Sequence, residues 1–128
     1  KAINIRLKKD SLCFIQSLVK QNSAHLMTNN TWMGRNFFSG GQILSLESYL
    51  HYNKDLIVEK LIPRNGNEYS KTLDLWLSNL ENNKNTIIKE FGESIYEKFR
   101  LFYIISSESF KSINGNNYMV CYYFLKKR

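Results

Sequence analysis

The sequence contains few of the residues that cross-link or punctuate small proteins: one proline, two cysteines and six glycines among 128 residues. Two cysteines are too few for a disulfide scaffold, and Cys13 and Cys121 both lie within apolar runs. We therefore expect reduced, buried thiols in a cytoplasmic protein. The longest apolar runs are also far shorter than the ~18–20 residues that a membrane-spanning helix needs.

Metal ligands and concentrated positive charge are scarce as well. His25 and His51 lack the paired spacing that zinc sites use, so no metal site is expected. The net charge is +7, from 18 basic and 11 acidic residues, but the basic residues are dispersed except at residues 8–9 and 126–128. A nucleic-acid-binding face needs a basic stripe, so we expect no nucleic-acid partner.

Apolar and aromatic side chains are abundant, at 43% and 14% of the residues respectively. This content predicts a folded core, and the length is that of one domain. Three segments have the composition of strands, namely residues 11–19, 55–62 and 118–125. The first is an almost continuous apolar run, which predicts a strand buried on both faces of an α/β sheet. Residues 20–31 are predicted to be a loop.

Helical periodicity dominates the second half of the chain. Apolar residues recur every three or four positions over residues 72–91, with Thr72 as the expected N-cap and a glycine at the end. Residues 93–112 form a second predicted helix, whose middle is apolar nearly all round; this predicts deep burial at Leu101, Ile104 and Ile105. A short helix is also expected over residues 43–50.

Three features of the sequence suit a ligand pocket, and each has a structural alternative. Gly40-Gly41 allows a close approach of backbone to a ligand, or only shapes a turn. Phe99, Phe102 and Tyr103 form a pocket wall or belong to the core. Glu108 lies on an apolar helix, where a carboxylate is costly unless it is paired or faces a cavity.

Four segments, in order along almost the whole chain, carry a resemblance to a known family. Residues 32–45 (WMGRNFFSGGQILS) resemble the W-x₄-F-F-x-G-G-x-x-P-S segment of cyclopropane-fatty-acyl-phospholipid synthase-like methyltransferases. Residues 68–77 (EYSKTLDLWL) are similar to the H-Y-x-x-T-x-x-x-W-L stretch of that family, and residues 99–110 to its W-R-x₇-E-L-F helix. Residues 114–120 (NGNNYMV) resemble its N-G-x-E-W-M-V segment. The last two segments are most similar to the coclaurine N-methyltransferase-like branch, whose members methylate small amines.

The resemblance implies that residues 1–128 are the C-terminal part of a single domain, that of a class I S-adenosylmethionine-dependent methyltransferase. In that Rossmann-like α/β fold the three predicted strands are the fifth, sixth and seventh of the sheet, the last one antiparallel, accompanied by two long helices. The glycine-rich cofactor loop and the E-x-x-E-H acid/base segment of the amine branch belong to the N-terminal half, and no G-x-G-x-G occurs here. Because the sequence begins with Lys1 rather than Met, we expect a piece of a longer protein.

Departures from the family pattern bear on the acceptor. Phe102 stands where the cyclopropane synthases have a Tyr associated with their bicarbonate base, which favours plain methyl transfer. Phe99, in place of the family's Trp, keeps an aromatic wall suited to a cationic amine. The expected activity is therefore N-methylation of a small amine. The alternatives are a lipid-modifying synthase, which the positive charge would help to dock peripherally on anionic membranes, and a truncated domain without activity.

The resemblance and the pocket features together give the expected substrate-binding residues. These are Phe38, Gly40, Gly41, Tyr69, Phe99, Phe102, Tyr103 and Glu108.

Because this chain has no glycine-rich phosphate or adenosine loop, we expect the isolated 128 residues not to bind S-adenosylmethionine. Calorimetric titration of the isolated chain is the measurement. Micromolar binding would contradict the inference that the cofactor site lies elsewhere in the protein.

Overall fold

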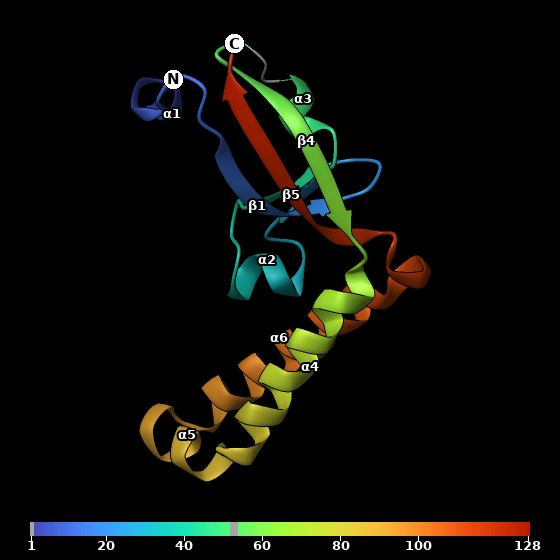
Figure 1. Ribbon diagram of the computed structural model, residues 1–128. Coiled ribbons are helices and arrows are strands. Elements are labelled where there is room, and N and C mark those ends of the chain that lie inside the picture. The colour runs from blue at the N-terminus through green and yellow to red at the C-terminus, as the bar shows by residue number, and fades with distance from the viewer. Residues whose placement is uncertain (1, 52–53) are drawn as a thin grey trace.

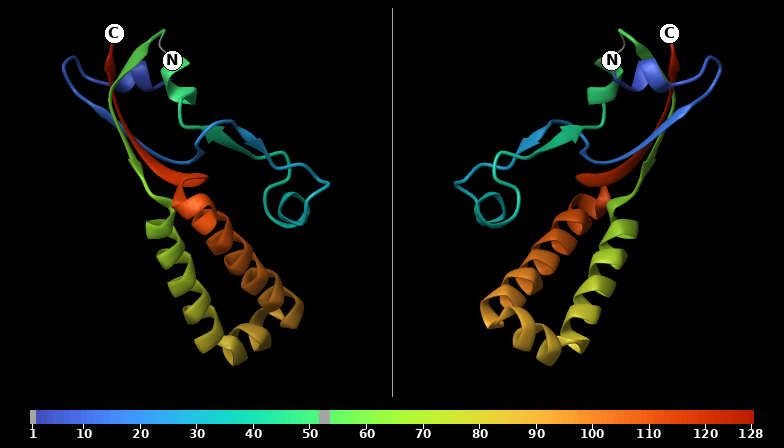
Figure 2. Two further views of the ribbon diagram at one scale, coloured as in Figure 1. Left: turned by 90° about the vertical axis from the view of Figure 1, so that its right-hand side faces the viewer. Right: turned by 90° about the vertical axis from the view of Figure 1, so that its left-hand side faces the viewer.

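A curled mixed sheet forms one end of the molecule, and a helical hairpin projects from it (Figures 1 and 2). The computed structural model describes residues 2–51 and 54–128, so Lys1 lies outside it. Within these ranges no helix combines the length and apolar character needed to cross a bilayer. The elements are α1 (Ala2–Arg6), β1 (Cys13–Lys20), β2 (His25–Leu26), α2 (Trp32–Asn36), β3 (Gln42–Ser45), α3 (Ser48–His51), β4 (Leu56–Arg64), α4 (Gly66–Asn82), α5 (Lys84–Phe91), α6 (Glu93–Gly115) and β5 (Tyr118–Lys127).

The sheet has the strand order β2-β3-β1-β5-β4. β5 is antiparallel to both of its neighbours, with a bulge in β4 between Val58 and Lys60. β1 and β3 are parallel, whereas β2 and β3 are antiparallel. The three predicted strands are therefore present as β1, β4 and β5. The α/β class with an antiparallel last strand is confirmed.

One face of the sheet packs into a small core centred on Tyr123. Its side chain is 0% exposed, its hydroxyl donates to the carbonyl oxygen of Leu46 at 2.9 Å, and its ring centroid lies 4.5 Å from that of Tyr49. Burial raises the pKa of Tyr123 and that of the Cys121 thiol. Cys121 is buried as expected, whereas Cys13 is only partly buried, and neither is bonded to another cysteine. The core is completed by Val19, Met119 and Leu125.

Several expectations for the N-terminal half are wrong. β1 is not buried on both faces, because Phe14 is 53% and Leu18 38% exposed on the face opposite the core. Residues 42–45 form β3 rather than the start of a helix over residues 43–50, and α3 begins only at Ser48. Pairing of this segment with β1 and β2 overrides its local helical spacing. The predicted loop over residues 20–31 also contains the short strand β2.

The first long helix begins earlier than expected. Asn65 rather than Thr72 is the N-cap, and its Oδ1 accepts a hydrogen bond from the backbone N–H of Asn67 at 2.9 Å. The helix also breaks at Asn83, so the predicted single helix over residues 72–91 is the pair α4 and α5. Gly92, with φ 88°, ends α5 as expected.

α4 and α6 are the two long helices of the hairpin and pack against each other (Figure 2). Leu73 of α4 and Phe110 of α6 are buried, but Leu101 is 41% exposed. The deep burial expected in the middle of α6 is therefore wrong at Leu101, because the hairpin covers only one side of that helix. Helical geometry ends at Ser112, as the predicted boundary and the following turn required.

The hairpin joins the sheet at a crowded junction. A Cβ added at Gly66 would collide with the backbone carbonyl oxygens of Tyr118 and Phe110. Nδ2 of Asn65 donates to the carbonyl oxygen of Asn114 at 3.0 Å. The start of α4 therefore packs directly against the end of α6 and the start of β5.

Gly66→Ala should lower the stability of the protein by about 1–3 kcal/mol, the usual cost of overpacking, because neither colliding atom belongs to a mobile side chain. Chemical denaturation measures the effect, with Asn67→Ala at the next, exposed position as the control. Equal unfolding midpoints for the two variants would show that the junction is not tightly packed.

Candidate functional site

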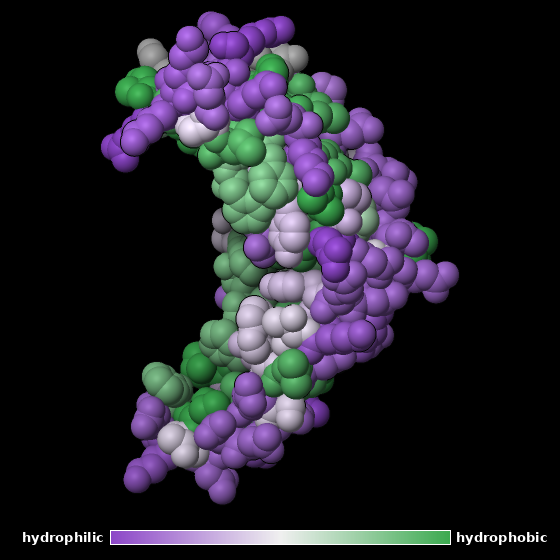
Figure 3. All heavy atoms as spheres, viewed as in Figure 1, coloured by the Kyte–Doolittle hydropathy of each residue, from purple (hydrophilic) through white to green (hydrophobic). Residues whose placement is uncertain are grey.

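A cavity of about 460 Å³ lies between the hairpin and the arm formed by β2, β3 and α2. This arm extends from the sheet on the α6 side of the hairpin (Figure 2). Leu18 of β1 and Tyr118 of β5 complete the wall. In the space-filling view, apolar residues gather along the concave side of the molecule and polar residues cover the convex side (Figure 3). A cavity of this size suits a ligand with the dimensions of a small metabolite.

The α2 region presents two phenylalanines to α6. Thr31 caps α2 by accepting a hydrogen bond from the Gly34 N–H at 3.0 Å, which fixes the start of this short helix. The ring centroids of Phe37 and Phe38 lie 4.6 Å and 5.9 Å from that of Phe102. These ring contacts hold the arm against α6 and close one side of the cavity.

One face of α6 forms the inner wall of the cavity. Its lining residues follow each other at spacings of three and four, which places them on one side of a helix. The hydroxyl of Ser109 donates to the carbonyl oxygen of Ile105 at 2.8 Å, so its donor is already used within the helix. The lining residues of α6 are Phe102, Ile105, Ser106, Ser109 and Phe110.

Three titratable side chains, Tyr69, Tyr118 and His25, line the described part of the cavity. The ring centroid of Tyr69 lies 4.7 Å from that of Phe110. Burial, and secondly Tyr103, raise the pKa of Tyr69, while burial raises the pKa of Tyr118. The imidazole of His25 lies edge-on to the ring of Tyr118, with the centroids 6.1 Å apart. Both phenols therefore stay neutral around pH 7 and can donate hydrogen bonds.

The structure brings half of the expected substrate-binding residues to the cavity. Those that line it are Phe38, Gly41, Tyr69 and Phe102. Phe99 and Tyr103 instead form a second aromatic layer, with ring centroids 5.3 Å from Phe37 and 6.1 Å from Trp76 respectively. Gly40 is an exposed turn residue with φ 72°.

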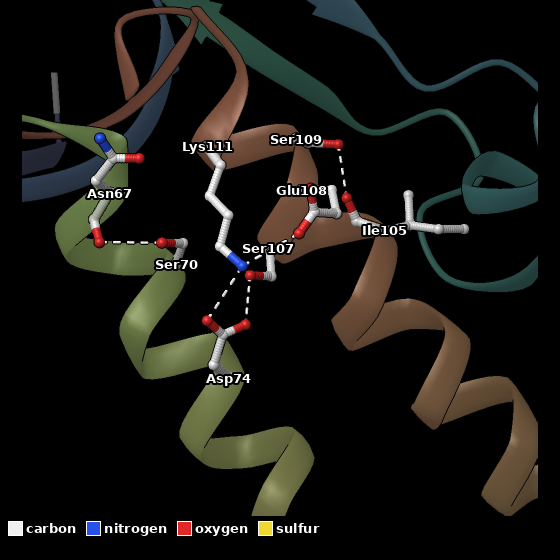
Figure 4. A network of polar contacts seen from close by, with 8 residues as sticks. All are labelled: Asn67, Ser70, Asp74, Ile105, Ser107, Glu108, Ser109 and Lys111. Carbon is white, nitrogen blue, oxygen red and sulfur yellow. Dashed lines mark hydrogen bonds and ion pairs between the residues drawn. The ribbon is translucent and has the colours of Figure 1, made fainter. Parts of the chain in front are cut away.

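Glu108 does not face the cavity, contrary to expectation. Its side chain is 68% exposed, and its Oε1 lies 3.1 Å from Nζ of Lys111. Nζ of Lys111 also lies 3.2 Å from Oδ2 of Asp74, whose Oδ1 accepts a hydrogen bond from Ser107. The cluster therefore links α6 to α4 (Figure 4). The physical reason is helical geometry: at about 100° per residue, Glu108 points away from the face that carries Phe102.

Electrostatics in this cluster favour the ionised forms. The hydrogen bond from Ser107 and then the Lys111 ammonium lower the pKa of Asp74. Glu108 and then Asp74 raise the pKa of Lys111. The cluster therefore holds the hairpin together and is separate from the cavity.

Several lining residues were not found from the sequence. His25 falls in a segment predicted to be a loop, and Tyr118 in a segment recognised only as a strand. Ser106 and Ser109 share the helical face of Phe102, so their spacing from that residue was the available signal. The positions of His25 and Tyr118 depend on pairing between distant strands, which local patterns do not encode.

The curled sheet with its antiparallel last strand, and the cavity between the hairpin and the arm, fit the class I methyltransferase fold. A model of the mycolic acid cyclopropane synthetase family matches residues 1–120, and the chain belongs to this family.

Individual relatives agree with this assignment. The chain is 33% identical over 81 residues to the S-adenosylmethionine-dependent methyltransferase UmaA of Mycobacterium tuberculosis, covering 62% of this chain and 28% of UmaA. Coclaurine N-methyltransferase bound to N-methylheliamine and SAH has the same fold, with a TM-score of 0.87 and 22% identity over 98% of this chain and 41% of that one. The cyclopropane synthase MmaA2 of M. tuberculosis has a TM-score of 0.75 and 17% identity, covering 95% of this chain and 46% of that one. The chain spans less than half the length of each of these relatives.

The described lining of the cavity carries no acidic side chain. Nucleoside sites commonly use a carboxylate for the ribose hydroxyls. Within residues 2–51 and 54–128, no three His, Cys, Asp or Glu side chains form a group that could hold a metal ion.

Acid should weaken the hairpin through Asp74. The pKa of Asp74 is lowered in the folded state, so the ionised carboxylate stabilises the fold. This stabilisation is fully present above the ordinary pKa of about 4. It is lost as the pH falls through the lowered pKa. Asp74→Asn should therefore melt below the wild type at pH 6, and the difference should shrink at pH 3. Thermal unfolding midpoints measure this, with the exposed Asp10→Asn as the control. A difference that stays constant with pH would contradict the role of this carboxylate.

Proposed function

We propose that this chain forms the acceptor-binding side of an S-adenosylmethionine-dependent methyltransferase that methylates a small amine. The observation that carries the proposal is the cavity of about 460 Å³ with an aromatic wall made by Phe38, Tyr69, Phe102, Phe110 and Tyr118. Ring faces attract a cationic amine, and the apolar lining excludes water from it.

The cofactor is proposed to be held by residues of the protein outside this chain, which makes residues 1–128 a C-terminal part of one domain. UmaA is named as an S-adenosylmethionine-dependent methyltransferase, and coclaurine N-methyltransferase was solved with SAH, so relatives support this cofactor. S-adenosylmethionine supplies an electrophilic methyl group on sulfur. We also place the enzyme in the cytoplasm, where Cys121 stays reduced.

The residues of this chain act by positioning. The tilted ring contact between Phe37 and Phe102 fixes the arm and thereby limits the orientations of the acceptor. The neutral phenols of Tyr69 and Tyr118 can donate hydrogen bonds to a polar substituent of the acceptor. Orientation and exclusion of water supply much of the acceleration that a group transfer of this kind requires.

A lipid acceptor is the second candidate. It is favoured by the apolar side chains Leu18, Met27, Met33 and Ile43 in the lining and by the description of the matched family, mycolic acid cyclopropane synthetase. The net charge of +7 would then assist contact with an anionic membrane surface.

Calorimetric binding to the full-length protein separates the two acceptors. The probes are 2-phenylethylamine, largely protonated at pH 7.5, and vesicles of phosphatidylglycerol. We expect the amine to bind. Phe102→Ala and Phe102→Leu should each raise its dissociation constant about tenfold, because a ring face is lost. Glu108 lies outside the cavity, so Glu108→Gln should leave the dissociation constant within twofold of the wild-type value.

Vesicle binding without amine binding would favour the lipid acceptor. If the Phe102 and Glu108 variants change the dissociation constant of the amine equally, the amine does not bind in this cavity and the proposal is wrong.

A further inference from the structure

We propose that His25 is a proton acceptor in the cavity, taking the proton from a protonated amine so that the nitrogen lone pair becomes free to accept a methyl group. This inference rests on the proposed function and deepens it. It concerns a residue on the arm of this chain, distinct from the acid/base segment that the family resemblance assigns to the N-terminal half.

The position of His25 is well defined by backbone pairing. His25 pairs with Ile43 across β2 and β3. Two residues on, the N–H of Met27 donates to the carbonyl oxygen of Gly41 at 2.8 Å, and the N–H of Gly40 donates to the carbonyl oxygen of Met27 at 3.2 Å. The imidazole is thereby carried on a paired segment and held at the cavity wall.

Within the described chain, the imidazole makes a ring contact with Tyr118 but no hydrogen bond or ion pair. The contact is nearly perpendicular, at 85°, which restricts the ring plane without occupying the ring nitrogens. A ring nitrogen is consequently available to an acceptor bound in the cavity.

Among the described lining residues of this chain, His25 is the one suited to take up the proton. The other titratable side chains in the described cavity lining are Tyr118 of β5 and Tyr69 of α4. Lys20 of β1 lies near Tyr118, with its Nζ 5.9 Å from the Tyr118 ring centroid. The two phenols keep their protons at neutral pH, and an ammonium group takes up no further proton. The described lining holds no carboxylate. Imidazole is the side chain that exchanges protons most readily near pH 7.

The proposed step balances in atoms and charge. One N–H bond of the ammonium acceptor breaks and its electron pair stays on nitrogen, giving a neutral amine. The imidazole nitrogen gains the proton and the positive charge, and the imidazolium later returns the proton to water.

The pH dependence of catalysis by the full-length protein tests the proposal. The probe is 2-phenylethylamine with S-adenosylmethionine; an alkylammonium of this kind has a pKa of about 10, like that of lysine. In the wild type, kcat/KM should rise less steeply with pH than in the His25→Gln variant, because the predominant protonated amine can react. In His25→Gln, kcat/KM should be about 100-fold lower at pH 7 and rise tenfold per pH unit up to pH 9, because only amine that is already neutral then reacts.

Controls separate a chemical role from a structural one. His51→Gln alters the other histidine of this chain, on α3 outside the cavity lining, and should behave as the wild type. The quaternary N,N,N-trimethyl derivative of the probe has no N–H proton to lose. Its dissociation constant in His25→Gln, and in a second variant, His25→Asn, should therefore stay within twofold of the wild-type value.

The outcomes distinguish the two levels of the proposal. If His25→Gln shows a profile parallel to that of the wild type, His25 is not the proton acceptor, whereas the amine methyltransferase function stands. If the wild type fails to methylate the amine, the proposed function is overturned and this inference with it. Convergence of the two profiles at high pH supports the proton transfer.

Discussion

The arrangement of the molecule depends on one steric constraint, the absence of a side chain at Gly66. At this point the first turn of α4 touches the backbone of both α6 and β5, and an added Cβ would collide with two carbonyl oxygens. Asn65 caps α4 and also bonds to the carbonyl oxygen of Asn114 in the turn after α6. The hairpin is thus joined to the sheet at both of its ends, which fixes its direction and hence the space between α6 and the arm.

The cavity is a consequence of that geometry and of two ring contacts. Phe37 and Phe38 reach across to Phe102 and hold the arm of β2, β3 and α2 against the hairpin. His25, carried on β2, comes to lie beside Tyr118, which opens β5 immediately after the junction. Residues separated by most of the chain length therefore share one wall, and a shift of the hairpin would separate them.

Two faces of α6 have different roles. The face that carries Phe102, Ser106 and Ser109 lines the cavity, while the face that carries Ser107 and Lys111 bonds to Asp74 of α4. This division explains why a carboxylate is tolerated on an apolar helix: Glu108 is exposed and paired with Lys111 rather than turned into a pocket. Helical spacing alone already separated Glu108 from Phe102 by angle, although it did not show which face is hollow.

Local signals predicted part of the fold. Apolar runs indicated the strands β1, β4 and β5, glycine indicated the helix end at Gly92, and helical spacing indicated the aromatic face of α6. The motif around Phe38 and Gly41 likewise indicated part of the cavity lining. Strand pairing at β2 and β3, the cap at Asn65 and the exposure of one face of β1 were decided only by the tertiary structure. Several of the contacts involved join residues that are distant in the chain: β3 pairs with β1, Asn65 also bonds to the carbonyl oxygen of Asn114, and His25 contacts Tyr118. Sequence patterns report what a segment prefers by itself, whereas backbone pairing and close packing select among those preferences once the segments meet.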